Sequence, residues 1–197
     1  GIKEDGTMVA CHVHQVFNSG AYGAFSPRIM LPGARRAAAS YRIPHGKVEM
    51  HMVYTNSIPC GHMRAPGEVQ SVFAIESHID MIARELGRDP YDFRLQNAVQ
   101  EGDTTLIGDG FAEVRAEETL KVAAEAGSWH QPSSGKATGR GISLAERRSG
   151  QGESTATLTL DADGTVTLHT PVWDTGTGAQ TILQQIIAEE LTVSPED

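Results

Sequence analysis

Two early segments of the chain alternate between apolar and polar residues. In residues 7–18, Val9, Cys11 and Val13 alternate with Ala10, His12 and His14, and residues 47–54 repeat the pattern with Val48, Met50, Met52 and Tyr54. A period of two is typical of a half-buried strand. The sequence therefore predicts two strands in its first third.

The pattern then changes to a helical period. Apolar residues recur at spacings of three and four, at Val72, Ile75, Ile79, Ile82 and Leu86. This spacing predicts an amphipathic helix, and Gly87 supplies its end. Asp89-Pro90 predicts the start of a second helix, with Asp89 as N-cap and Pro90 at the first helical position.

The second half of the chain repeats the mixture of strands and helices. Residues 117–126 predict a helix, residues 139–146 a strand, and residues 154–160 and 165–170 a hairpin turned at 161–164. A last helix follows the segment DTGTGAQT at 174–181. Its expected buried stripe consists of Ile182, Leu183, Ile186, Ile187 and Leu191.

The order of these elements predicts an α+β protein with two domains. The polar segment 131–138 (QPSSGKAT) is the expected linker. It separates a first domain at 1–130 from a second at 139–197. Because both ends of the chain pass directly into element patterns, we expect an internal piece of a larger polypeptide or one split subunit.

The composition argues against several kinds of binding partner and structural site. The net charge is −9, which argues against a general affinity for nucleic acid or anionic membrane. No apolar run approaches the roughly 18 residues that span a bilayer. Cys11 and Cys60 are too few for a disulfide framework or a structural zinc site. A reducing compartment is the expectation.

The loop at residues 61–67 (GHMRAPG) carries one arginine between glycines and before a helix. The planar fork of Arg64 suits a phosphate or a polar ring. The alternative is a surface arginine that pairs with Glu68 and contributes little energy. The residues alone slightly favour this alternative.

The glycine loop at 176–178 follows a strand and opens a helix. Free backbone N–H groups at a helix start, beside glycines that allow close approach, would cradle an anion or a polar heterocycle. The alternative, which the residues alone favour, is a tight turn that needs glycine for its dihedral angles. The segment lacks the ending of a Walker loop.

Other candidate groups are weaker. His12 and His14 share one strand face, and His51 and His62 lie near the arginine loop, but none follows a recognised metal-ligand spacing. Glu76 and Asp80 share a helix face, which predicts a solvated or hydrogen-bonded stripe rather than an acid/base pair. Cys60 is expected to fill space rather than to act as a nucleophile.

Taken together, these motifs resemble one family. The matching segments are GAYGAF at 20–25, YRIP at 41–44, YTN at 54–56, the arginine loop, FAxE at 73–76, Asp80, LGxDP at 86–90, RxxN at 94–97, DGxV at 163–166, DxGTGxxT at 174–181 and AExL at 188–191. In this order they resemble the large, molybdenum-cofactor-binding subunit of the xanthine dehydrogenase/aldehyde oxidase family.

The resemblance implies two partial mixed α/β domains that hold a molybdopterin-type cofactor. The cytosine dinucleotide is one alternative form of that cofactor. The implied reaction is hydroxylation of an aldehyde or N-heterocycle with oxygen from water. The implied partners are an iron–sulfur subunit, a flavin (FAD) subunit and the remaining part of the large subunit, with a dimer of such heteromers as one assembly. The expected compartment is the cytoplasm, with the periplasm as the alternative.

The resemblance also implies site residues. Met63 and Arg64 would contact the cofactor, Ala65 and Pro66 would line the substrate side, and the loop of Gly176, Thr177 and Gly178 would touch the pterin. No metal ligand is expected from the protein. Thr177 replaces the glutamine of many members, and Ala65 stands where carbon-monoxide dehydrogenases carry a copper-binding cysteine, which argues against carbon monoxide as the substrate.

The family's glutamate base has no counterpart in this chain, so no catalytic residue is assigned. Two other hypotheses remain open from the sequence. One is a non-catalytic assembly or binding module, and the other is a phosphate-binding module that uses residues 174–181.

Overall fold

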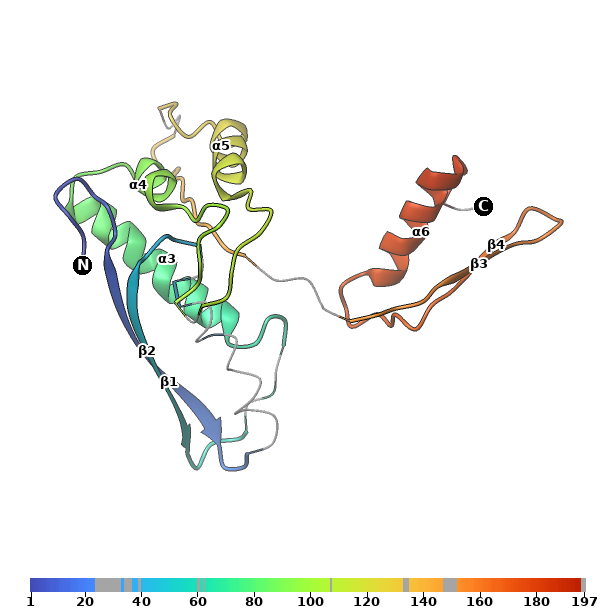
Figure 1. Ribbon diagram of the computed structural model, residues 1–197, viewed down its shortest axis with the longest axis horizontal. Coiled ribbons are helices and arrows are strands. Elements are labelled where there is room, and N and C mark those ends of the chain that lie inside the picture. The colour runs from blue at the N-terminus through green and yellow to red at the C-terminus, as the bar shows by residue number, and fades with distance from the viewer. Residues whose placement is uncertain are drawn as a thin grey trace. The chain divides into compact units, whose positions relative to one another are not determined.

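A computed structural model describes residues 1–23, 33, 37–38, 40–59, 61, 63–106, 108–132, 135–146 and 152–195. They form two compact units, Gly1–Arg147 and Arg148–Asp197. Each unit combines strands with helices (Figure 1), which confirms the predicted α+β class. The predicted linker at 131–138 and the domain limits on either side of it stay predictions.

The first unit is built on a parallel pair of strands, β1 (Ala10–Gly20) and β2 (His45–Tyr54). Their register places Ala10 opposite His45 and Phe17 opposite Met52. Along β1 the odd-numbered side chains from Cys11 to Phe17 are half-buried and the even-numbered ones are exposed. Both predicted strands are therefore confirmed, although the parallel pairing was not predicted.

Three helices complete the first unit: α3 (Glu68–Glu85), α4 (Pro90–Asn97) and α5 (Ala116–Ala126). Helix α3 lies along the strand pair (Figure 1), where Gln15 Nε2 of β1 donates to Ser71 Oγ of α3 over 2.7 Å. The buried apolar residues include Tyr41, Ile79, Ala83, Phe93 and Leu120. Within the predicted stripe of α3, Ile79 is buried and Leu86 is exposed.

The predicted helix ends are confirmed in detail. Asp89 Oδ1 accepts hydrogen bonds from the N–H groups of Tyr91 at 2.7 Å and Asp92 at 3.2 Å, so it caps α4. The indole N–H of Trp129 donates to the same carboxylate at 3.0 Å, which ties the segment after α5 to the start of α4. Gly87 follows α3 at φ 64°, a value that favours glycine.

A buried polar network fastens α3 to its neighbours. Glu76 Oε1 accepts from the Tyr41 hydroxyl at 2.6 Å, and Glu76 Oε2 accepts from Arg94 Nε at 2.9 Å and from the Leu144 N–H at 3.0 Å. Arg94 Nη1 also donates to Asp80 Oδ1 at 2.7 Å. The hydrogen-bonded alternative for Glu76 and Asp80 is thus confirmed, and Glu76 is buried as well.

The prediction of a strand at 139–146 is wrong. All eight residues are described, and none of them belongs to a strand. Leu144 is nevertheless buried, and Ile142 packs against the core. The apolar alternation of this segment therefore reflects packing against α3, because its N–H at Leu144 bonds to a side chain instead of a neighbouring strand.

The second unit contains an antiparallel hairpin, β3 (Thr157–Leu160) and β4 (Val166–His169), and helix α6 (Ala179–Leu191). The predicted turn forms with Asp161 N–H bonded to Thr165 O at 2.9 Å and Gly164 at φ 92°. The predicted buried stripe of α6 is wrong in part: Ile182, Ile186 and Leu191 are exposed, and Leu183 and Ile187 are half-buried. Only Ala188 of α6 is buried among the described residues.

Within the described part of the chain, no helix combines the length and the apolar character needed to cross a membrane.

Candidate functional site

The arginine loop has an uncommon backbone conformation. Arg64 and Ala65 both have φ 45°, and Gly67, the residue before α3, has φ 77°. The left-handed region costs an L-residue with a Cβ about 1–2 kcal/mol, and such outliers gather at functional sites. Ala65 O accepts from the N–H groups of Glu68 at 3.0 Å and Val69 at 3.3 Å, so the loop runs directly into α3.

The surrounding structure holds this loop in place. Gly67 O accepts from the Ser71 hydroxyl at 2.9 Å, and Gln15 of β1 in turn donates to that hydroxyl. A Cβ added at Gly33 would lie 2.6 Å from Gly67 O, so a glycine is needed there for the close approach. Ser71 of α3, itself bonded to Gln15 of β1, therefore holds the end of the loop at Gly67.

The side chains at the tip of the loop are exposed to solvent, and those that follow are half-buried. Met63 is 83% exposed, Arg64 is exposed, and Ala65 and Pro66 are half-buried. Arg64 has no hydrogen bond or ion pair with any residue that the structure describes. The predicted alternative, a pair with Glu68, is therefore not formed. His62 and Cys60 lie outside the described residues.

The backbone N–H groups of the glycine loop are bonded to a side chain of the same loop. Asp174 Oδ1 accepts from the N–H groups of Gly176 at 2.7 Å, Thr177 at 2.9 Å and Gly178 at 3.2 Å. Gly176 at φ 92° and Gly178 at φ 77° turn these three donors toward one point. One carboxylate oxygen therefore accepts all three N–H groups, which agrees with the tight turn that the residues alone favoured, and the contact with the pterin stays a prediction.

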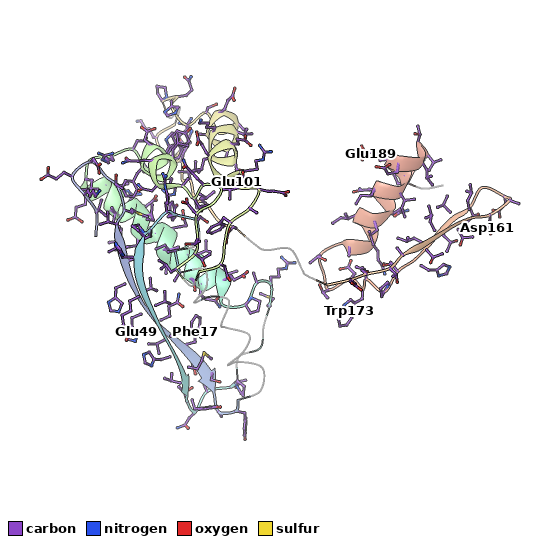
Figure 2. The ribbon with its side chains drawn as sticks, viewed as in Figure 1. Phe17, Glu49, Glu101, Asp161, Trp173 and Glu189 are labelled. Atoms are coloured by element: carbon purple, nitrogen blue, oxygen red, sulfur yellow. The ribbon has the colours of Figure 1, made fainter. Side chains whose placement is uncertain are left out.

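The hydrogen bonds from the loop also lower the pKa of the Asp174 carboxyl group. The pKa of Asp174 lies below its ordinary value of 3.8, chiefly because the Gly176 N–H stabilises the charged carboxylate. The loop is exposed from Pro171 to Thr177 (Figure 2 labels Trp173, which is 79% exposed). The Asp174 carboxylate thus carries its negative charge at neutral pH on an open loop.

Three histidines of the strand pair, His12, His14 and His51, contact other side chains. His12 Nε2 lies 2.6 Å from Glu49 Oε2, and the rings of His14 and His51 meet edge to face at 5.0 Å. Glu49 is labelled on the strand pair in Figure 2, and the His12 hydrogen bond is the main cause that lowers its pKa to about 2. In the described ranges, no three His, Cys, Asp or Glu are arranged to hold a metal ion.

Glu76 is the one buried carboxylate among the described residues, but its geometry does not suit a general base. Both of its carboxylate oxygens accept hydrogen bonds within the protein, and its relative exposure is only 6%. A base must reach a proton of the substrate. Glu76 is therefore structural, and the catalytic residue stays unassigned within this chain.

The sequence contained a signal for Asp174 that we did not use. An aspartate two residues before a glycine often accepts the N–H groups that follow it. The burial of Arg94 had no such signal, since its partner Glu76 lies 18 residues away on another helix. The structure thus places Met63, Arg64, Ala65 and Pro66 in one loop and Gly176, Thr177 and Gly178 in another, in separate compact units.

Comparisons with known proteins match nearly the whole chain. Residues 1–98 and residues 115–197 match two families that are each described as a molybdopterin cofactor-binding domain. The chain is 34% identical to the aldehyde oxidoreductase of Megalodesulfovibrio gigas over 90% of its residues, which is 20% of that relative. It is 30% identical over its full length to the xanthine dehydrogenase molybdenum-binding subunit of Escherichia coli O157:H7, covering 28% of it.

Solved structures agree with this match. The chain is similar to the structure of the aldehyde oxidoreductase from Desulfovibrio gigas, with a TM-score of 0.77 and 31% identity. The similarity covers 100% of this chain and 23% of that one. The chain therefore spans between a fifth and just over a quarter of the length of the curated relatives compared here.

Proposed function

This chain belongs to the molybdenum-binding subunit family of xanthine dehydrogenases and aldehyde oxidoreductases, and we propose that it supplies part of the molybdopterin site of a molybdenum hydroxylase. The observation that carries the proposal is the Arg64 loop. It presents an exposed guanidinium with no partner among the described residues, on a strained and braced backbone, within the match at residues 1–98.

The described residues fit such a cofactor, with one restriction. A molybdopterin combines a polar heterocycle with a phosphate, and the planar fork of Arg64 can donate to either of them. In the loop at 174–178 the Asp174 carboxylate accepts the N–H groups that an anion would need. It therefore suits a group that donates hydrogen bonds, and it is poorly suited to an anion.

Each residue of the arginine loop then has a distinct role. Arg64 donates charge-assisted hydrogen bonds and orients the cofactor. Met63, being apolar and exposed, covers an adjoining surface and excludes water. Ala65 and Pro66 are small or rigid, so they leave space on the substrate side without competing for hydrogen bonds.

When bound, the molybdenum cofactor supplies the redox chemistry that inserts oxygen from water into a carbon centre. The chain's own share is positioning and electrostatics. Both oxygens of Glu76 are engaged, so the buried carboxylate of the described residues is not a candidate base for a proton at the substrate. The base would be the glutamate that the resemblance implies for the family and that has no counterpart in this chain.

The finer assignments follow from the same family membership as proposals. The substrate is an aldehyde or an N-heterocycle, and Ala65 argues against carbon monoxide. Electrons pass to an iron–sulfur subunit and a flavin subunit. The cofactor is of the molybdopterin type, with the cytosine dinucleotide as one alternative form, and the compartment is the cytoplasm, with the periplasm as the alternative.

The test is the cofactor content of Arg64 variants, purified together with the partner subunits. Charge-assisted hydrogen bonds contribute about 1.5–3 kcal/mol, so Arg64→Ala should weaken cofactor binding roughly ten- to hundred-fold. Molybdenum is measured by mass spectrometry and the pterin by fluorescence after oxidation. Arg64→Lys should fall between wild type and Arg64→Ala, because lysine keeps the charge and loses the fork.

Arg115→Ala is the matched control. Arg115 is also exposed, and its only described ion pair is a local one with Glu118 at 2.9 Å. It should retain full cofactor occupancy. Equal occupancy in Arg64→Ala and Arg115→Ala would refute the role of Arg64, and a wild type without molybdenum or pterin would favour a non-catalytic assembly module instead.

A further inference from the structure

Gln15 of β1 carries a buried oxygen without a partner. Its carboxamide Oε1 is shielded from solvent and has no hydrogen-bond partner within the described part of the chain. A buried acceptor that gives up its hydrogen bonds to water destabilises the folded state. An apolar side chain of the same shape would avoid this loss at the half-buried position of residue 15. The stability of the first unit therefore does not explain why this residue is a glutamine.

The hydrogen bonds of Ser71 determine which way the Gln15 carboxamide faces. Ser71 has one hydroxyl proton, which it donates to Gly67 O at 2.9 Å. The 2.7 Å contact between Ser71 Oγ and the Gln15 side chain is therefore a bond that Gln15 Nε2 donates. Turning the carboxamide over would place Oε1 against the lone pairs of Ser71 Oγ and break this bond. The unpaired Oε1 is thus a consequence of the bond to Ser71.

This bond joins strand β1 to the first turn of α3, which begins directly after the arginine loop. Ser71 lies in that turn and is only 3% exposed. Ala65 O accepts from the first two N–H groups of the helix at 3.0 and 3.3 Å, so the loop backbone follows the position of the turn. Arg64 and Ala65 both have φ 45°, and such a strained backbone persists only where its surroundings hold it.

We propose that Gln15 is a positioning residue for Arg64. Through Ser71 it holds the first turn of α3 against β1, and this turn keeps the strained loop in the conformation that presents Arg64 to the cofactor. A side chain that supports a strained loop and leaves its own oxygen unpaired is expected at a functional site. This inference rests on the proposed function and adds to the site a residue of β1 that acts on the cofactor only through Arg64.

Gln15→Met is the test, because methionine keeps the unbranched shape of glutamine and removes both polar atoms of the carboxamide. The midpoint of urea unfolding of the full chain should equal that of wild type or rise, since the unpaired oxygen is gone. Release of the cofactor from the complex purified with the partner subunits should become about three- to tenfold faster, which corresponds to one ordinary hydrogen bond. Release at a fixed temperature is followed by fluorescence of the oxidised pterin.

Gln96→Met is the matched control in the same unit. Gln96 is also half-buried, but both of its polar atoms have partners: Oε1 accepts from Arg88 Nη1 at 2.8 Å, and Nε2 donates to Asp5 O at 3.0 Å. Gln96→Met should therefore lower the urea midpoint and leave the rate of cofactor release unchanged. Opposite responses of the two variants would show that release does not simply follow global stability.

A double variant shows whether Gln15 acts through Arg64. In the Arg64→Ala background, Gln15→Met should add no further increase in the release rate. The inference is overturned by a lower urea midpoint for Gln15→Met, by a release rate equal to wild type, or by a full additional effect on top of Arg64→Ala. Faster release in Arg64→Ala without any change in Gln15→Met refutes only the role of Gln15. Unchanged release in Arg64→Ala refutes the proposed function, and this inference with it.

Discussion

At the scale of residues, two carboxylates each accept several hydrogen bonds and thereby fix the local structure around them. Asp174 accepts three backbone N–H groups on an open loop, and Glu76 accepts from Tyr41, Arg94 and Leu144 in the interior. Burial and the nearby Glu76 charge raise the pKa of the Tyr41 phenol far above its ordinary value. The proton of that hydrogen bond therefore stays on Tyr41, which donates to Glu76 Oε1.

Glu76→Gln should destabilise the first unit strongly. Arg94 is only 1% exposed, so the change removes one of the two carboxylates that offset its buried charge and leaves only Asp80, at a cost of about 3 kcal/mol. Urea unfolding of the full chain measures this free energy. Glu85→Gln, an exposed change on the same helix, is the control and should stay within about 0.5 kcal/mol of wild type. Equal effects in both variants would mean that the network is not needed.

The exposed pair of His12 and Glu49 gives a prediction on pH. The pKa of Glu49 is lowered to about 2 from 4.5 by the His12 hydrogen bond first and by Lys47 second. Because the folded pKa is lower, this contribution to stability is present above pH 4.5 and is lost as the pH falls toward about 2. In His12→Ala the Glu49 pKa should rise toward 4.5, as measured by ¹³C NMR of its carboxyl group. An unchanged value would assign the shift to Lys47 instead.

At the scale of elements, the ends of helices were predicted best, because their chemistry is local. Asp89-Pro90, Gly87 and the Asp161–Gly164 turn act through bonds to neighbours a few residues away. The segment at 139–146 shows the limit of this reasoning. Its alternation is real, with Leu144 buried, but a strand needs a partner strand, and the described structure provides the side chain of Glu76 instead.

Asp89→Ala tests the cap of α4. The variant loses the oxygen that accepts from the N–H groups of Tyr91 and Asp92 and the bond to the Trp129 indole, so the free energy of unfolding should fall by about 1–2 kcal/mol. Thermal or urea unfolding followed by tryptophan fluorescence measures this change. Asp92→Ala, an exposed change in the same helix turn, should cost less than half as much. A similar loss in both variants would indicate a general charge effect at the helix start in place of a cap.

At the scale of the whole molecule, much of the candidate site could be predicted from order and spacing of motifs, since family membership depends on them. The exposure of Arg64 and its position before α3 follow from the Gly/Pro-rich loop at 61–67. Two features of the structure could not be predicted from the sequence. The parallel pairing of β1 with β2 depends on a crossover whose path the alternation does not encode. The hydrogen bonds of the N–H groups at 176–178 depend on the side-chain conformation of Asp174, which the spacing of the motif does not determine.

The parallel strand pair also has a kinetic consequence. Each pairing, such as Ala10 with His45, joins residues that are far apart in sequence, and the brace from Gln15 to Ser71 spans 56 residues. Contacts of long sequence separation form late, because chain entropy must be lost before they are gained. The conformation of the Arg64 loop should therefore be acquired at the end of folding, after α3 and α4 have formed. A newly synthesised chain would then pass through a stage with its helices in place and its arginine loop unformed, and cofactor loading would have to wait for the final step of sheet formation.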